Sequence, residues 1–198
     1  TIHIMRKLLF LSFTIVLALS LPVDSLHAQT SKKEIRELLK SLQNEKEINV
    51  IFDISNAMIE GQSEADFIDR EVILYGDGWI ELWENEYKPS IYDEFLSEFI
   101  SLMYEFGYNV RFGNFENAKY QIRLDVNNIK VSGHATINAN IEERKTERVL
   151  YDFTVKGRGG QYGTKVNLIG DGFRRAGKKM AIRMNKIFIC GKAISFWH

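Results

Sequence analysis

The sequence has very little cysteine, proline or histidine. Cys190 is its only cysteine, so no disulfide can form within the chain and packing must stabilise the fold. The chain has two prolines, Pro22 and Pro89, so it contains no proline-rich linker. Only His134, beside a hairpin glycine, and His198 lie beyond residue 28, and this inventory argues against a histidine-based catalytic triad or a histidine-rich zinc site. These shortages predict a packed domain with no metal site and no cofactor.

One long apolar run is present, at Leu8–Leu21, directly after two basic residues. The run stops at Pro22 and falls short of the roughly 20 apolar residues that a membrane-spanning helix needs. This anatomy is typical of a signal peptide. We expect residues 1–28 to be a signal peptide removed after Ala28, and residues 29–198 to form a single α+β domain that is periplasmic or secreted. The run is not followed by a cysteine that could carry a lipid, so no lipidation is expected.

The charges balance over the whole chain but are separated along it. Residues 29–108 contain 7 basic and 18 acidic side chains, a net charge of −11, and residues 109–198 contain 17 and 7, a net charge of +10. Such a division permits two interpretations. The two halves attract each other within one compact fold, or they face different partners.

Hydrophobic periodicity predicts the order of helices and strands. A helical period appears at residues 31–43, 90–107 and 166–187, with Ser90 expected to cap the second of these helices, and Ser63 with Asp66 predicts a capped helix or ordered loop at 61–72. A period of two predicts a first strand at 47–55. Four further strands are then predicted at 109–112, 120–131, 134–143 and 147–157.

The predicted fold is α+β, with a mainly antiparallel sheet made of the first strand and a four-stranded meander. One face of this sheet is apolar, so we expect the 90–107 helix and the 166–187 helix to cover it. The alternation slips at Asn127 and Asn128, which predicts a β-bulge. Two segments fit no period: residues 75–89, predicted to be irregular, and residues 188–198, an apolar tail of unknown role.

A glycine-rich basic stretch, KGRGGQYGTKVNLIGDGFRRAGKKM at 156–180, leads into the last helix. Its spacing matches neither the nucleoside-triphosphate loop nor the dinucleotide-binding loop. A helix N-terminus can still hold an anion, with the donors Gly159, Gly160, Thr164 and Lys165. The favoured alternative is architectural, because glycine lets a strand turn sharply into a helix that packs close to the sheet.

Two surfaces are candidates for a ligand or partner. The first is a pair of tryptophans beside an acidic cluster, and paired carboxylates next to aromatic rings would suit a sugar. Its residues are Trp79, Trp83, Glu64, Asp66 and Asp69. The second is a basic helix face, which would suit an anionic membrane or glycan: Arg174, Arg175, Lys178 and Lys179. For both surfaces a merely solvated face is the favoured alternative. Nucleic acid is not an expected partner, because the chain is predicted to be exported.

The order strand, helix, meander, helix, with YQIRLDVNNIKV (120–131) and GDGFRRAGKKM (170–180) towards its ends, resembles small α+β modules of bacterial envelope assembly. These modules occur in the curli-secretion, lipopolysaccharide-assembly and penicillin-binding-protein-activator lipoproteins and at the N-terminus of the Tol-system propeller protein. The chain is also similar to exported Gram-negative proteins that have no assigned activity. The resemblance covers about residues 48–187 and implies a non-catalytic periplasmic adaptor that binds another envelope protein. The alternative hypothesis is a small sugar-binding or anionic-lipid-binding protein, or a hydrolase, that uses the Trp79–Trp83 region.

Overall fold

The structure is a computed structural model, and it describes residues 37, 41–42 and 44–192. The chain divides into two units, Thr1–Thr30 and Ser31–His198, and all the described residues belong to the second. The predicted signal peptide, most of the predicted helix at 31–43 and residues 193–198 of the predicted tail lie outside the described residues.

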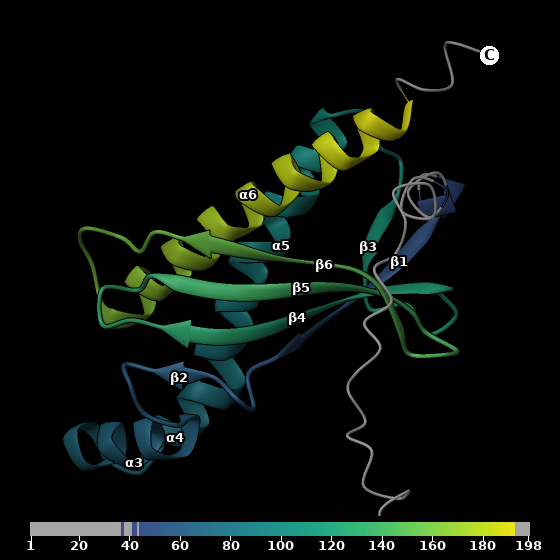
Figure 1. Ribbon diagram of the computed structural model, residues 1–198. Coiled ribbons are helices and arrows are strands. Elements are labelled where there is room, and N and C mark those ends of the chain that lie inside the picture. The colour runs from purple at the N-terminus through teal and green to yellow at the C-terminus, as the bar shows by residue number, and fades with distance from the viewer. Residues whose placement is uncertain (1–36, 38–40, 43, 193–198) are drawn as a thin grey trace, which may run out of the picture. The chain divides into compact units, whose positions relative to one another are not determined.

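Eleven elements follow one another in the described part of the chain (Figure 1). Two strands come first, β1 (Glu47–Asp53) and β2 (Met58–Ile59). A helical region follows, made of α3 (Glu64–Tyr75), α4 (Gly78–Leu82), the π-helical turn η1 (Trp83–Tyr87) and α5 (Lys88–Glu105). The described part continues with β3 (Arg111–Gly113), β4 (Tyr120–Ile129), β5 (Ala135–Glu143), β6 (Arg148–Gly157) and the long helix α6 (Lys165–Lys192).

The fold is α+β as predicted, but its sheet is mixed. The strand order is β3-β1-β4-β5-β6, with β2 paired to β4. Strand β1 runs parallel to both β3 and β4, whereas the β4-β5 and β5-β6 pairs are antiparallel. The predicted four-stranded meander is therefore wrong: it contains three strands, and β3 joins the opposite edge of the sheet.

The helical region explains the parallel pairs. A parallel partner can be reached only through a crossover connection of a dozen residues or more, whereas an antiparallel partner can follow a short turn. The α3-to-α5 region lies between β1 and β3 in the sequence and provides this crossover. The predicted bulge is confirmed, because the β4-β5 register shifts between Val126 and Asn128.

The predicted cover of the sheet is also confirmed. Helices α5 and α6 pack against each other and lie on one face of the sheet (Figure 1). The core between them is built from alternate strand residues and from one stripe of each helix. Its fully buried members include Ile122, Leu124, Ile137, Ile141, Phe95, Phe99, Phe173, Met180 and Met184.

Glycines bring α6 unusually close to the strands. A Cβ atom added to Gly172 would lie 1.9 Å from the carbonyl oxygen of Gly133, and one added to Gly157 would lie 1.7 Å from that of Gly172. Against α5, a Cβ atom on Gly177 would lie 2.3 Å from the Phe95 oxygen. These distances support the architectural interpretation of the glycine-rich stretch, because no larger residue fits at such contacts.

Two local predictions are wrong. Residues 78–87, within the segment predicted to be irregular, form α4 and η1, because Trp79 and Trp83 fall on the same face one turn apart and both are buried. Ser90 does not cap α5, since the helix begins at Lys88 and continues directly from η1. The cap at Ser63 is confirmed: its side chain accepts a hydrogen bond from the backbone N–H of Asp66 at 3.2 Å.

Candidate functional site

Four charged side chains meet where α3 approaches the start of α6. The Glu71 carboxylate, 1% exposed, lies 2.7 Å from the Arg70 guanidinium and 2.5 Å from the Lys165 ammonium group. Glu60, 6% exposed, pairs with the same Arg70 and lies 3.5 Å from Lys165. Both cations also lie over the ring of Phe67. The quartet is neutral overall, and it ties the acidic half of the chain to the basic half.

The quartet is poorly suited to acid-base catalysis. Burial acts to raise the pKa of Glu71, but the hydrogen bonds from Lys165 and Arg70 together outweigh it and leave the pKa lowered. A glycosidase acid must instead keep its proton near neutral pH, which requires a raised pKa. Since both carboxylates are neutralised by cations, the arrangement is that of a structural ion-pair network.

The tryptophans predicted as sugar platforms lie inside the protein. Trp79 is 8% exposed and Trp83 is 1% exposed, with their rings stacked 5.5 Å apart. Phe67 packs edge-on against both. The indole N–H of Trp83 donates to Glu64 at 2.9 Å, and Glu64 also pairs with Lys88. The two rings therefore fill a small core between α3 and η1 and present no open platform.

The other acidic candidates have separate places. Asp66 takes part in the helix cap with Ser63, and Asp69 is exposed. Together with Glu64 they do not converge on one cleft. In the described residues no group of three or more acidic, histidine or cysteine side chains is arranged to hold a metal ion.

The residues predicted to bind an anion mostly have partners within the protein. The Gly160 N–H donates to the Leu168 carbonyl at 3.2 Å, Thr164 bonds to Asn167, and Lys165 pairs with Glu71. Gly159 is packed so that a Cβ atom there would lie 1.8 Å from the Ser132 oxygen. An anion would have to displace these contacts, and the site stays a prediction.

The predicted basic face of α6 divides into two groups. Arg174 pairs with Asp171 on the same helix, and Arg175 donates to the carbonyls of the preceding loop. Lys178 and Lys179 are exposed, and neither has an ion-pair partner among the described residues. The free positive charge of the helix therefore begins in its second half.

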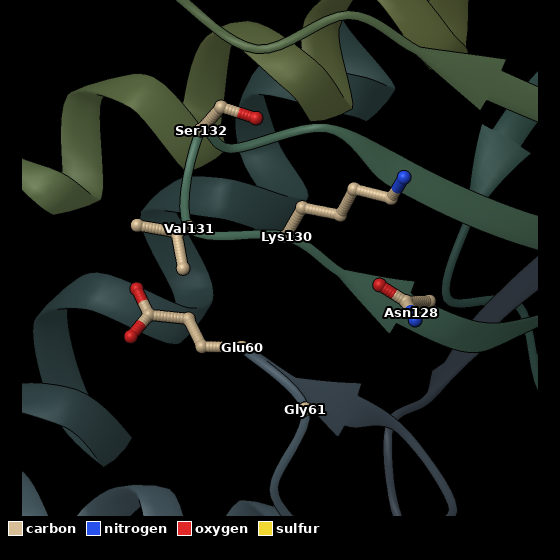
Figure 2. Close-up of a pocket in the computed structure, with 6 residues that line it drawn as sticks. All are labelled: Glu60, Gly61, Asn128, Lys130, Val131 and Ser132. Carbon is tan, nitrogen blue, oxygen red and sulfur yellow. The ribbon is translucent and has the colours of Figure 1, made fainter.

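An open depression of about 540 Å³ lies between the turn after β2 and the β4-β5 hairpin (Figure 2). Its lining residues are Glu60, Gly61, Asn128, Lys130, Val131 and Ser132. In Figure 2 the amino group of Lys130 and the carboxylate of Glu60 point away from each other. Ser132 contacts His134 at 2.8 Å on the exposed hairpin, but in the part of the chain that the structure describes no carboxylate bonds to this histidine, as a catalytic triad requires. The depression therefore presents no converging catalytic groups.

An exposed apolar surface lies at the end of α3 and on α4, and the sequence analysis did not predict it. Ile73, Leu74 and Tyr75 at the end of α3 are 84%, 61% and 68% exposed, and Ile80 on α4 is 46% exposed. We call these four residues the apolar tip. Helix α3 buries Phe67 and Glu71 on one face, but its last turn extends past the core before Gly76 ends it.

The signal for the apolar tip was present in the sequence. Three large apolar residues in succession directly precede a glycine at a helix end, and a helix face can bury only part of such a run. Exposed apolar side chains that gather in one place typically mark an interaction surface.

The apolar tip lies in a strongly acidic part of the chain. Residues 60–87 contain nine acidic side chains and one basic side chain, Arg70, for a net charge of −8. Asp77 and Glu81, next to the tip in sequence, are exposed and form no ion pair within the described residues. This negative field repels an anionic lipid surface and favours a partner with positive charge.

Comparisons with known proteins found similarity only at the level of structure. No family model and no curated protein matches the sequence. PelC from Paraburkholderia phytofirmans, described as a dodecamer, is 12% identical with a TM-score of 0.34 over 68% of this chain and 87% of that chain. A Xanthomonas campestris protein of the family DUF330 is 13% identical with a TM-score of 0.36, over 77% and 89% respectively.

At these identities and TM-scores no functional conclusion follows from the two bacterial proteins. The resemblance to envelope-assembly modules therefore stays a prediction. Among the helices of the described residues, none is long and apolar enough to cross a membrane.

Proposed function

We propose that the chain is a non-catalytic, exported protein of the bacterial cell envelope that binds another protein through its apolar tip. The observation that carries the proposal is the exposure of Ile73, Leu74 and Tyr75 in succession on an ordered helix. Full burial of a large apolar side chain contributes about 1.5–3 kcal/mol. A partner that covers the tip therefore gains a substantial hydrophobic contribution without further rearrangement.

Two further observations support this function over catalysis. The buried carboxylates Glu60 and Glu71 are both committed to ion pairs, and the stacked tryptophans belong to the core. Export is supported by the apolar run at Leu8–Leu21 that follows basic residues. Its proposed destination is the periplasm or the cell exterior, with no lipid anchor.

A photo-crosslinking experiment in a bacterial host tests the binding surface. A photoreactive amino acid replaces Tyr75 in one strain and Tyr162, a tyrosine that is 87% exposed in the loop before α6, in the control strain. We expect a discrete crosslinked protein from position 75 and none from position 162. Equal labelling at both positions, or none at position 75, contradicts the proposal.

Export is tested in the same strains by cell fractionation and mass spectrometry. We expect the protein in the periplasmic or extracellular fraction with Gln29 as its first residue. An intact chain that remains in the cytoplasm contradicts this part of the proposal.

A further inference from the structure

A second surface complements the apolar tip in both charge and polarity. On the second half of α6, Ile182 and Ile189 are 37% and 52% exposed. Exposed lysines surround them at helical spacings of three and four, which places all five residues on one side of the helix. We call this surface the basic face: Lys178, Lys179, Ile182, Lys186 and Ile189.

The unpaired charges of the two surfaces are opposite in sign. Lys178, Lys179 and Lys186 are exposed on the basic face, and Asp77 and Glu81 are exposed beside the tip. Like the acidic groups beside the tip, the three lysines of the basic face form no ion pair with any described residue. Each surface thus combines exposed isoleucines with unpaired charge at neighbouring positions, and apolar contact with complementary charge is what protein interfaces use.

The two surfaces cannot meet within one molecule. Lys165 at the start of α6 contacts Glu71, which lies only two residues before the tip begins. Ile182 lies 17 residues further along α6, which at 1.5 Å per residue is about 25 Å away. In Figure 1 the end of α6 accordingly points away from α3 and α4. The quartet therefore pairs charges of the acidic and basic halves only at the start of α6, and the basic face further along the helix is not part of it.

We infer that the apolar tip of one copy docks on the basic face of a second copy. The inference rests on the proposed function and names the partner of the same surface. Because two different surfaces meet, the contact is heterologous, so repetition builds a ring if the rotation closes and a filament if it does not. Electrostatic attraction at the rim makes the association stronger at low salt.

Sedimentation velocity on the full chain tests the inference with two charge-reversed variants. The first carries Asp77→Lys and Glu81→Lys beside the tip, and the second carries Lys178→Glu and Lys179→Glu on the basic face. All four positions are exposed, so each variant is expected to fold, which circular dichroism verifies. We expect the wild type to form assemblies that salt dissociates, and each variant alone to associate at least about tenfold more weakly.

A mixture of the two variants gives the sharpest result. The reversed tip of the first variant matches the reversed face of the second, and their unchanged surfaces also match, so the mixture recovers the assemblies that each variant alone has lost. Ile73→Asp weakens association through the apolar part of the contact. Val131→Asp, a matched substitution on an exposed hairpin residue, leaves association unchanged.

The outcomes separate the inference from the proposed function. A wild type that stays monomeric at every protein and salt concentration, or a mixture that does not recover, overturns the inference. If the probe at Tyr75 then crosslinks to a different protein, the proposed function stands with another partner. If the probe crosslinks to nothing, the proposed function falls as well, whereas a product with the mass of two chains supports both.

Discussion

The contact between α6 and the sheet provides the most direct test of the fold. The substitution Gly172→Ala adds one methyl group where its carbon would lie 1.9 Å from the carbonyl oxygen of Gly133. The oxygen is a backbone atom and the position of the methyl carbon is fixed by the backbone of residue 172, so neither can rotate away. Since Cβ atoms essentially never lie within 3.0 Å of another heavy atom, α6 must move outward by about 1 Å or more, which opens the packed core.

The magnitude follows from two opposing effects. Overpacking of this kind costs about 3 kcal/mol, whereas replacing glycine by alanine inside a helix returns about 1 kcal/mol. We therefore expect Gly172→Ala to lower the free energy of unfolding by about 2 kcal/mol. The control is Gly170→Ala in the same helix, where the new carbon would meet only the Glu94 side chain at an ordinary 3.6 Å. This variant is expected to gain up to about 1 kcal/mol.

Urea denaturation monitored by circular dichroism measures the difference between the two variants, which is expected to be about 3 kcal/mol with equal denaturant dependence. If Gly172→Ala is as stable as Gly170→Ala, then α6 does not lie at the described distance from the hairpin. The close glycine packing, and with it the architectural interpretation of this stretch, would then be refuted.

Three further predictions concern buried polar groups. For Glu71→Gln, we expect the free energy of unfolding to fall by about 2 kcal/mol at neutral pH, because two partly exposed cations lose a buried partner. Since the pKa of Glu71 in the folded state lies below 4.5, denaturation measured across pH should show this loss shrinking as the pH falls below 4.5. A loss that grows as the pH falls would contradict the ion pairs. Trp83→Phe should lower the free energy of unfolding, measured in urea, by about 1 kcal/mol more than Trp79→Phe does, because only the former removes an indole hydrogen bond within the described residues. Equal losses would count against that hydrogen bond. Asn49→Leu should cost about 1–2 kcal/mol in thermal unfolding, since the Asn49 side chain accepts a hydrogen bond from the backbone of Phe115 at 3.0 Å, and an unchanged melting temperature would show that this bond contributes nothing.

Local patterns in the sequence predicted much of the fold. Alternation identified β4, β5 and β6, and the slip at Asn127 and Asn128 identified the bulge, because these signals depend only on which side chains face the core. The position of β3 could not be found in this way. Its pairing with β1 is decided by the crossover through α5 and not by any property of the three residues Arg111–Gly113.

The candidate site was harder to predict because burial is a property of the assembled fold. Trp79 and Trp83 are residues that could stack against a sugar, but in the fold Phe67 packs against both rings and they are buried in the core. Within the described residues nothing covers the last turn of α3, so the apolar tip can be recognised only once α3 and α4 are placed. Lys165 likewise looked free in the sequence and is held by Glu71 in the structure.

The parallel pairing of β1 with β4 has a consequence for how the protein folds. Asn49 of β1 pairs with Gln121 of β4, and the apolar face of that sheet is covered by α5 and α6 together. Contacts between residues so distant in sequence form late and slowly. The sheet therefore closes only after β4 and α6 have joined β1 and α5, so the unfolded chain exposes its apolar strand faces for longer than a chain built from local contacts would.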